Sequence, residues 1–258
     1  MTSTAAAPPP PRAYRRLSVE ERRAQLLVAA LGLFAHRAPD EVSLDEVAVA
    51  AGVSRPLVYR YFPGGRQQLY EAALGSAADE LKLCFTEPPV GPPTERVARV
   101  LDRYLRFVDE HDTGFSALLR GGSVVETSRT TSIVDGVRRA AAEEILSHLG
   151  RFGGAGGRGA GPRLRMMVRS WIAAVEAASL IWLDEGKQPS AAELCGWLVD
   201  HLIALLAATA ATDEETATVV RDLLALETPD GPAGRLAELV IPVVADAAHL
   251  LPHAPAAD

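Results

Sequence analysis

The sequence has few of the residues from which disulfide frameworks, zinc sites and β-sheets are built. It contains two cysteines, Cys84 and Cys195, which lie far apart and show no CxxC spacing. Neither a disulfide framework nor a zinc site is therefore predicted, and a reducing cytoplasm is the expected location. Aromatic residues make up only 5% of the chain, whereas alanine and leucine dominate it. This composition favours helices, because alanine loses no side-chain entropy in a helix.

No secretion signal or membrane span is predicted. The N-terminus lacks the basic start and the apolar run of a signal peptide. The most apolar stretch, residues 166–183, is interrupted by Arg169, Ser170 and Glu176, which disfavours a membrane span. Of the 258 residues, 48% are apolar and 23% are charged. We therefore expect one large or two modest globular domains.

Charge is unevenly distributed along the chain. The formal net charge is −7, and an acidic protein is on average repelled by nucleic acid. Residues 1–70, however, contain nine arginines and no lysine against six acidic residues, a balance of +3 that leaves −10 for the remainder. The N-terminal part is therefore where we expect DNA to bind.

The N-terminal part begins with an arm and two capped helices. Residues 1–13 are rich in alanine and proline and are expected to form a disordered arm. Ser18 with Glu21, and Ser43 with Glu46, have the spacing of capping boxes. These two patterns predict the starts of the first and second helices.

The second and third helices have the arrangement of a helix-turn-helix. Gly52 can supply the positive φ of the sharp turn. The third helix is predicted over residues 54–62, before the run Pro63-Gly64-Gly65 ends it. We therefore predict an all-α fold, with a helix-turn-helix DNA-binding domain at 14–66 and a larger helical domain at 67–258.

The larger domain shows successive amphipathic helices and no sustained period-two alternation that would indicate a strand. The predicted helices are 66–85, 94–110, 113–121, 126–149, 163–185, 190–209, 213–227 and 235–250.

Helical periodicity predicts which face of the third helix is buried. At about 100° per residue, Val58 and Phe62 share one face and are expected to anchor the helix in the core. The opposite face then carries Pro56, Leu57 and Arg60.

The exposed face of this helix has the residue types that suit a DNA major groove. Its two arginines can each donate a bidentate pair to O6 and N7 of guanine. Its two tyrosine hydroxyls, Ser43 and Arg66 suit phosphate oxygens instead. The alternative is that the tyrosines are packing residues and the arginines a solvated face. The residues predicted to contact DNA are Ser43, Arg55, Pro56, Leu57, Tyr59, Arg60, Tyr61 and Arg66.

The same part of the chain resembles the tetracycline-repressor (TetR) family. The resemblance covers about residues 18–70 and is carried by Leu26–Ala30, Leu33–Phe34, Ser43–Leu44, Val47–Ala48, Ala51–Ser54, Val58–Phe62 and Leu69. It implies a homodimeric repressor whose third helix reads bases and whose Tyr59 holds the DNA backbone. It also implies that the remaining helices form a ligand-binding and dimerisation domain.

The chain departs from the family pattern after the third helix. Where the family has a short Ser/Asn-Lys-Glu link, this chain has residues 63–67, Pro-Gly-Gly-Arg-Gln. Arg66 can replace the lysine as a phosphate ligand, although the extra residue changes its placement.

Aromatic residues of the larger domain are candidates for a ligand pocket, because such pockets combine aromatic side chains with a few polar groups. The alternative is ordinary core packing. Glu176 shares a helix face with Arg169, so this pair can orient a ligand, bridge to a second subunit or form a simple ion pair. The predicted ligand-binding residues are Tyr104, Phe107, Phe115, Trp171 and Glu176.

The predicted helices 163–185 and 190–209 are expected to form a homodimer interface. A dimer sets two recognition helices about 34–36 Å apart, in successive major grooves. A small-molecule effector that splays the domains would spoil this spacing and release a palindromic operator. The expected partners are thus double-stranded operator DNA, a small molecule and a second copy, with no membrane, metal or cofactor.

Two other classes of function stay open. An all-helical enzyme would need a nucleophile or an acid–base pair, and the sequence indicates no catalytic residue. A nonspecific architectural DNA-binding protein would need a broadly basic surface, contrary to the acidic remainder. The GxGxxG match at 154–159 follows no predicted strand, and His249 and His253 lack further metal ligands.

Overall fold

The computed structural model describes residues 17–34, 36–37, 39–112, 128–149 and 160–247. These residues form helices and no strand, which confirms the all-α prediction for this part of the chain. The expected arm at 1–13, the expected helix at 113–121 and the residues 154–159 lie outside the described ranges.

Three short helices form the N-terminal unit: α1 (Val19–Phe34), α2 (Leu44–Ala50) and α3 (Arg55–Tyr61). A 3-10 turn, η1 (Pro39–Glu41), precedes α2. Gly52 has a φ of 64° and joins α2 to α3, as predicted. Gln25 on α1 donates a hydrogen bond from Nε2 to the Ala51 carbonyl at 2.7 Å, which ties this turn to the first helix.

Both predicted capping boxes are present. Ser18 Oγ accepts a hydrogen bond from the Glu21 N–H at 3.0 Å, and the Glu21 carboxylate accepts one from the Ser18 N–H at 2.7 Å. Ser43 and Glu46 make the same reciprocal pair at 3.2 and 2.9 Å. Each box satisfies two backbone donors that a helix start leaves without intrahelical partners. Ser54 occupies the N-cap position of α3, but its side chain makes no capping bond.

The remaining helices are α4 (Gly65–Leu83), α5 (Pro93–Glu110), α7 (Ser128–Leu149), α8 (Pro162–Asp184), α9 (Ala191–Ala210), α10 (Glu214–Leu224) and α11 (Pro232–Ala247). Their bounds lie within three residues of the predicted ones. The largest differences are at α10, which ends at Leu224 rather than 227, and at α11, which begins at Pro232 rather than 235. Proline is well tolerated in the first turn of a helix, which explains the earlier start of α11.

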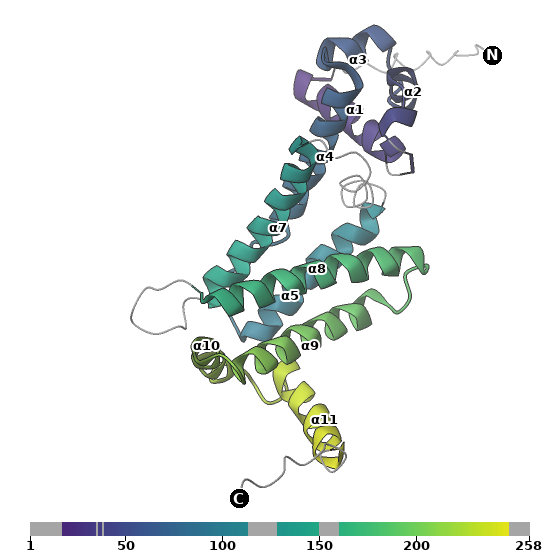
Figure 1. Cartoon of the computed structure of the whole chain (residues 1–258). Coiled ribbons are helices and arrows are strands. Elements are labelled where there is room, and N and C mark those ends of the chain that lie inside the picture. The colour runs from purple at the N-terminus through teal and green to yellow at the C-terminus, as the bar shows by residue number, and fades with distance from the viewer. Residues whose placement is uncertain (1–16, 35, 38, 113–127, 150–159, 248–258) are drawn as a thin grey trace, which may run out of the picture.

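The N-terminal unit lies at one end of the molecule, and α4 leads away from it alongside α7 (Figure 1). Helix α4 contacts α1 near its start and α7 along its length, while α8 packs on both α7 and α9. Helix α11 contacts α9 and α5 and projects at the opposite end of the molecule (Figure 1). One helix therefore connects the three-helix unit to the rest of the fold.

Helices α8 and α9 are each long and apolar enough to cross a membrane by length and composition. A core helix of a globular protein passes the same test, so this finding is weak evidence for a membrane span. Both helices have a buried side, which includes Trp171 on α8 and Leu198 on α9. Their other sides leave Ile181 and Trp197 about half exposed.

The core of the N-terminal unit forms around α3. Val58 and Phe62 are 0% and 1% exposed, which confirms both predicted anchors. They join Leu26 of α1 and Val47 of α2, each of which is also fully buried. Because Val58 within α3 and Phe62 directly after it are both buried, the direction of the opposite face of α3 is fixed as well.

Replacing the larger of the two anchors is expected to destabilise the fold strongly. Phe62→Ala removes a buried ring and should lower the free energy of unfolding by about 3–5 kcal/mol. Tyr59→Ala on the same short helix is the control, because Tyr59 is 42% exposed and its loss should change stability by about 0.5 kcal/mol or less. Urea unfolding monitored by circular dichroism measures both. Equal effects of the two substitutions would contradict the burial assigned to α3.

The capping box of α2 predicts a pH dependence of stability. A hydrogen bond from Arg37, together with those from Ser43, lowers the pKa of Glu46 to about 2 from 4.5. A carboxylate with a depressed folded-state pKa stabilises the fold above its unfolded pKa, and this contribution is lost as the pH falls toward the folded pKa. Glu46→Gln, which preserves the box but not the charge, should therefore be less stable than the parent above about pH 5, with the difference vanishing near pH 2.

Unfolding midpoints measured across this pH range test the expectation, with Glu80→Gln at an exposed position of α4 as the control. A stability difference for Glu46→Gln that persists unchanged to the lowest pH would contradict it.

Candidate nucleic-acid interface and ligand cavity

The outward face of α3 carries the side chains predicted to read DNA. Arg55, Pro56, Tyr59 and Arg60 are exposed there, while Leu57 and Tyr61 are half-buried. Four of the predicted contact residues on α3 are thus open to solvent, and Tyr61 also packs against the core.

Arg55 is held in place by a neighbouring helix. Its Nε lies 2.9 Å from Oδ1 of Asp45 on α2, and its Nη2 donates to Tyr59 Oη at 3.4 Å. Its guanidinium also lies 5.5 Å from the centre of the Tyr59 ring. The hydrogen bond with Tyr59 and the charge of Asp45 raise the pKa of Arg55. These contacts orient the arginine before any DNA is bound.

Arg60 is oriented by an aromatic ring instead of a carboxylate. Its guanidinium lies 6.0 Å from the centre of the Tyr61 ring. Within the described part of the chain, Arg60 forms no salt bridge. Its five N–H donors can therefore approach a base edge without first breaking an ion pair.

Ser43 and Arg66, which are both predicted to contact phosphates, already donate hydrogen bonds to other groups of the protein. The Ser43 hydroxyl donates to Oε2 of Glu46 at 2.7 Å, and Arg66 Nη1 donates to the Asp40 carbonyl at 2.7 Å. Both residues are exposed. The Arg66 contact ties the start of α4 to η1, which shows that the longer link after α3 still holds this arginine beside the helix-turn-helix.

A cavity lies within the larger domain, where α4, α5, α7, α8, α9 and α10 each contribute lining residues. Its volume is about 120 Å³, within a hollow of about 1060 Å³ that includes open solvent. A dry cavity of about 150 Å³ is large enough to bind benzene. The enclosed part of this cavity is somewhat smaller than that reference.

Three of the predicted ligand-binding residues, Tyr104, Trp171 and Glu176, meet at this cavity. Trp171 is fixed there by a hydrogen bond from Nε1 to the Leu198 carbonyl at 3.0 Å. Phe107 does not line the cavity and instead stacks on His111, with the ring centres 4.6 Å apart. Phe115 lies outside the described residues.

Glu176 has a partner that the sequence did not indicate. Its carboxylate lies 2.9 Å from Nη2 of Arg138 on α7, rather than forming the ion pair considered with Arg169. Burial raises the pKa of Glu176, while Arg138 lowers it, and the net shift is upward. Arg169 lies beside Arg138 and Arg139 in a separate, more polar hollow.

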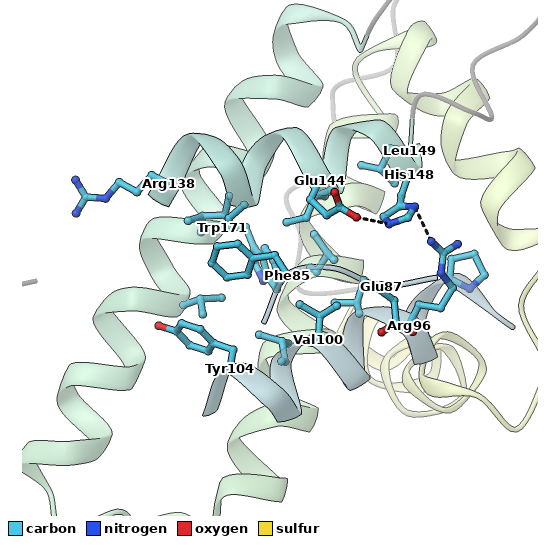
Figure 2. Close-up of a pocket in the computed structure, with 18 of the residues that line it drawn as sticks. Phe85, Glu87, Arg96, Val100, Tyr104, Arg138, Glu144, His148, Leu149 and Trp171 are labelled. Atoms are coloured by element: carbon cyan, nitrogen blue, oxygen red, sulfur yellow. Dashed lines mark hydrogen bonds and ion pairs between the residues drawn. The ribbon is translucent and has the colours of Figure 1, made fainter. Parts of the chain in front are cut away.

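The opposite end of the cavity contains polar residues that sequence reasoning missed (Figure 2). Arg96 on α5 is 8% exposed, and its Nη2 lies 2.6 Å from Nδ1 of His148 on α7. Nε2 of the same histidine lies 3.1 Å from Oε1 of Glu144. Glu87 beside them is 6% exposed.

The spacing of these residues in the sequence could have shown that they share a helix face with the predicted ligand-binding residues. Arg96 precedes Val100 and Tyr104 by one and two helical steps of four residues, so it lies on the face that also carries the predicted Tyr104. On α7, Ala141, Glu144 and His148 follow one another by three and four residues, so they also share a helix face. What the sequence does not show is that α5 and α7 border the same cavity.

Two family models match the chain. Residues 26–73 match "Bacterial regulatory proteins, tetR family", and residues 93–205 match "Tetracyclin repressor-like, C-terminal domain". The first range contains all of α2 and α3, and the second contains most of the helices that line the cavity.

Solved structures and curated proteins agree with these matches. A TetR-family transcriptional regulator from Streptomyces coelicolor is 50% identical, with a TM-score of 0.77 over 90% of this chain and 100% of that one. A TetR-like regulator from Rhodococcus sp. RHA1 shares the fold at 23% identity, with a TM-score of 0.57 over 74% of this chain and 99% of that one. The transcriptional activator FasR of Mycolicibacterium smegmatis is 25% identical over 174 residues, 67% of this chain and 77% of that protein.

The resemblance first seen in residues 18–70 therefore extends through the larger domain. The chain has an exposed basic helix on a helix-turn-helix core, matches two TetR family models, and is 50% identical to a relative that it matches over that relative's whole length. The chain therefore belongs to the TetR family of DNA-binding transcription regulators.

Proposed function

We propose that the protein is a homodimeric repressor that binds a palindromic operator and is released from it by a small molecule. The observation that carries this proposal is the orientation of α3, which buries Val58 and Phe62 and exposes Arg55 and Arg60. Family membership points to a transcription regulator rather than an enzyme. We expect it to act in the cytoplasm.

The contacts of α3 indicate which residues would bind DNA bases and which would bind phosphates. Arg60 reads a base through the major groove, because its guanidinium is oriented but makes no salt bridge with a described carboxylate. Arg55 contacts Asp45 through Nε and keeps further N–H donors for the DNA. Tyr59, Tyr61, Ser43 and Arg66 contact phosphates, which sets register without reading sequence.

The proposed ligand response depends on α4. Leu69 and Tyr70 near its start are buried in the N-terminal unit, where Tyr70 packs edge-on against Phe34 of α1 at 4.8 Å between ring centres. Leu81 near its other end lines the cavity. A ligand that displaces the end of a rigid helix also displaces the domain attached to its start, and we propose that this spoils the spacing of the two recognition helices.

The proposed dimer interface is the exposed side of α8 and α9. Ile181 and Met166 on α8 are 55% and 68% exposed, and Trp197 on α9 is 52% exposed. Between them lie small exposed residues, including Ala173, Ala174 and Ala177 on α8 and Ala204, Ala207 and Ala208 on α9. Two adjacent helices with an apolar outer face can form a four-helix bundle with the same pair from a second copy.

The most direct test of the function is protection of DNA upstream of the protein's own gene and its neighbours, followed by affinity measurements on the protected site. A repressor should bind the intact palindrome about a thousandfold or more tighter than scrambled DNA at the same salt concentration. Equal affinity for both would favour the architectural alternative and overturn the proposal.

Arg60→Ala should weaken operator binding by about 1–3 kcal/mol and relax the preference at one base pair of each half-site. Arg221→Ala is the matched control, since Arg221 is an exposed arginine on α10, which lies far from the helix-turn-helix (Figure 1). Fluorescence anisotropy with the intact site and with singly substituted sites measures both effects. Uniform weakening on every sequence, including scrambled DNA, would instead make Arg60 a phosphate contact.

Ala177→Glu should prevent dimerisation, because it places a charge in the middle of the proposed interface, where desolvation costs several kcal/mol. Val28→Glu on α1, where Val28 is 71% exposed, is the control. Sedimentation velocity should give a dimer for the parent and Val28→Glu and a monomer for Ala177→Glu. A dimeric Ala177→Glu protein would place the interface elsewhere.

A further inference from the structure

The charged side chains that line the cavity already contact partners within the protein. We propose that the cavity selects an uncharged, largely apolar effector, and that the ion pair between Arg138 and Glu176 helps to exclude ligands that carry a charge. This inference rests on the proposed function and names the chemical class of its effector.

At the polar end of the cavity, three side chains form a continuous chain of contacts (Figure 2). Arg96 Nη2 lies 2.6 Å from Nδ1 of His148, and Nε2 of the same ring lies 3.1 Å from Oε1 of Glu144. A guanidinium has only N–H donors, so Nδ1 accepts the hydrogen bond and the proton of the neutral imidazole is on Nε2. A charged ligand group at this end would therefore compete with contacts that the protein already makes.

Glu87, which also lines the cavity, is balanced from outside it. Its carboxylate lies 2.8 Å from Nη2 of Arg99 and 2.8 Å from Nη1 of Arg103, and neither arginine belongs to the lining. This carboxylate therefore needs no cation from a ligand.

At the end that contains Tyr104 and Trp171, the lining charges are those of Arg138 and Glu176. Nε and Nη2 of Arg138 lie 3.0 and 2.9 Å from Oε2 of Glu176. The Glu176 side chain is 14% exposed, whereas that of Arg138 is 47% exposed and points away from the other labelled residues (Figure 2). The inner carboxylate is thus neutralised by a cation that reaches solvent, and the pair leaves no unmatched charge for a ligand to bind.

The lining charges and their ion-pair partners balance one another. The set contains four arginines, Arg96, Arg99, Arg103 and Arg138, and four carboxylates, those of Glu87, Asp135, Glu144 and Glu176. A ligand of either charge would add one unmatched charge to a cavity whose other described lining residues are aliphatic or aromatic. A buried charge that has no counter-charge is strongly unfavourable, so the cavity favours a neutral molecule.

The polar groups of the two aromatic side chains add no charge. Trp171 directs its ring N–H to the Leu198 carbonyl at 3.0 Å. Burial raises the pKa of Tyr104, so its hydroxyl stays protonated. Eight residues of α5 separate Arg96 from Tyr104, which corresponds to about 12 Å along the helix. This lining suits an alkyl chain or a small ring, whose affinity comes from the removal of apolar surface from water.

The test uses the full-length parent protein and three probes with the same alkyl chain: 1-octanol, octanoate and octylammonium. At about pH 7.5 the acid and the amine are both ionised. Isothermal titration calorimetry measures binding, and fluorescence anisotropy measures release of labelled operator. 1-Octanol should bind at least about tenfold more tightly than either ion, because each ion loses water without gaining an available counter-charge. It should also bind roughly tenfold more tightly than 1-hexanol, because it buries two more methylene groups.

A substitution in the ion pair should change this selectivity. Arg138→Gln leaves the carboxylate of Glu176 without its arginine, so octylammonium should bind about tenfold more tightly than to the parent, while 1-octanol binding stays within a few-fold. Arg139→Gln is the matched control, since Arg139 is the next residue on α7 and is exposed but does not line the cavity. It should leave the binding of every probe within a few-fold.

The outcomes separate this inference from the function on which it rests. Binding of octanoate or octylammonium to the parent as tightly as 1-octanol, or no binding of 1-octanol, overturns the neutral assignment, and this comparison decides the matter alone should Arg138→Gln fail to fold. Unchanged octylammonium binding by a folded Arg138→Gln protein would contradict the role given to the ion pair. Operator release by one of the ions would leave the ligand-responsive repressor intact and overturn only the class of its effector. If 1-octanol binds preferentially but leaves operator affinity unchanged, the selectivity of the cavity stands and the proposed release mechanism is wrong.

Discussion

The packing of α4 constrains the rest of the structure. This helix has 19 residues and a length of about 28 Å. Its first turns supply Leu69 and Tyr70 to the core beneath the helix-turn-helix, and its last turns supply Leu81 to the cavity. Between them Ala73, Leu74 and Ala77 are buried, so the helix is packed along its whole length. Neither end can shift freely without a response at the other, because packed interiors transmit displacement instead of absorbing it.

The helix-turn-helix can follow α4 as a unit because its own core is tightly held. Two capping boxes satisfy the starts of α1 and α2, and Gln25 and Arg66 tie the turn and η1 to the flanking helices. The helix α3 has only seven residues and would not be stable alone. Its stability comes from the burial of Val58 and Phe62, and the same burial aims its arginines outward.

Local sequence patterns predicted the N-terminal unit well, since capping boxes, a positive-φ glycine and a two-residue anchor all act within about ten residues. The cavity depended on long-range contacts that a single sequence does not contain. Arg96 and His148 are 52 residues apart, and they meet because α5 and α7 border the same cavity. Phe107 belongs to the same apolar helix as Tyr104, yet its ring stacks on His111. Helical periodicity predicts which broad face of a helix is buried, but it does not predict which residues of that face border a cavity.

The same limit applies to the apolar helices α8 and α9. On α9, Leu198 and Leu202 are buried within the subunit, whereas the neighbouring Trp197 is half exposed and packs edge-on against His201. A helix that is apolar on all sides must be covered on all sides, and its composition alone does not show which residues face its own subunit and which face a partner. The structure separates an inner side, which borders the cavity, from an outer side that we assign to a second copy.

We propose that α4 transmits the state of the cavity to the DNA-binding unit. Spin labels at Gln68, an exposed position at the start of α4, allow the distance between the two copies in a dimer to be measured by pulsed electron paramagnetic resonance. On addition of a ligand that releases the operator, we predict that this distance changes by several ångströms while a reference distance between labels at Ala192 on α9 stays constant. Release of the operator with no change in the Gln68 distance would contradict the account.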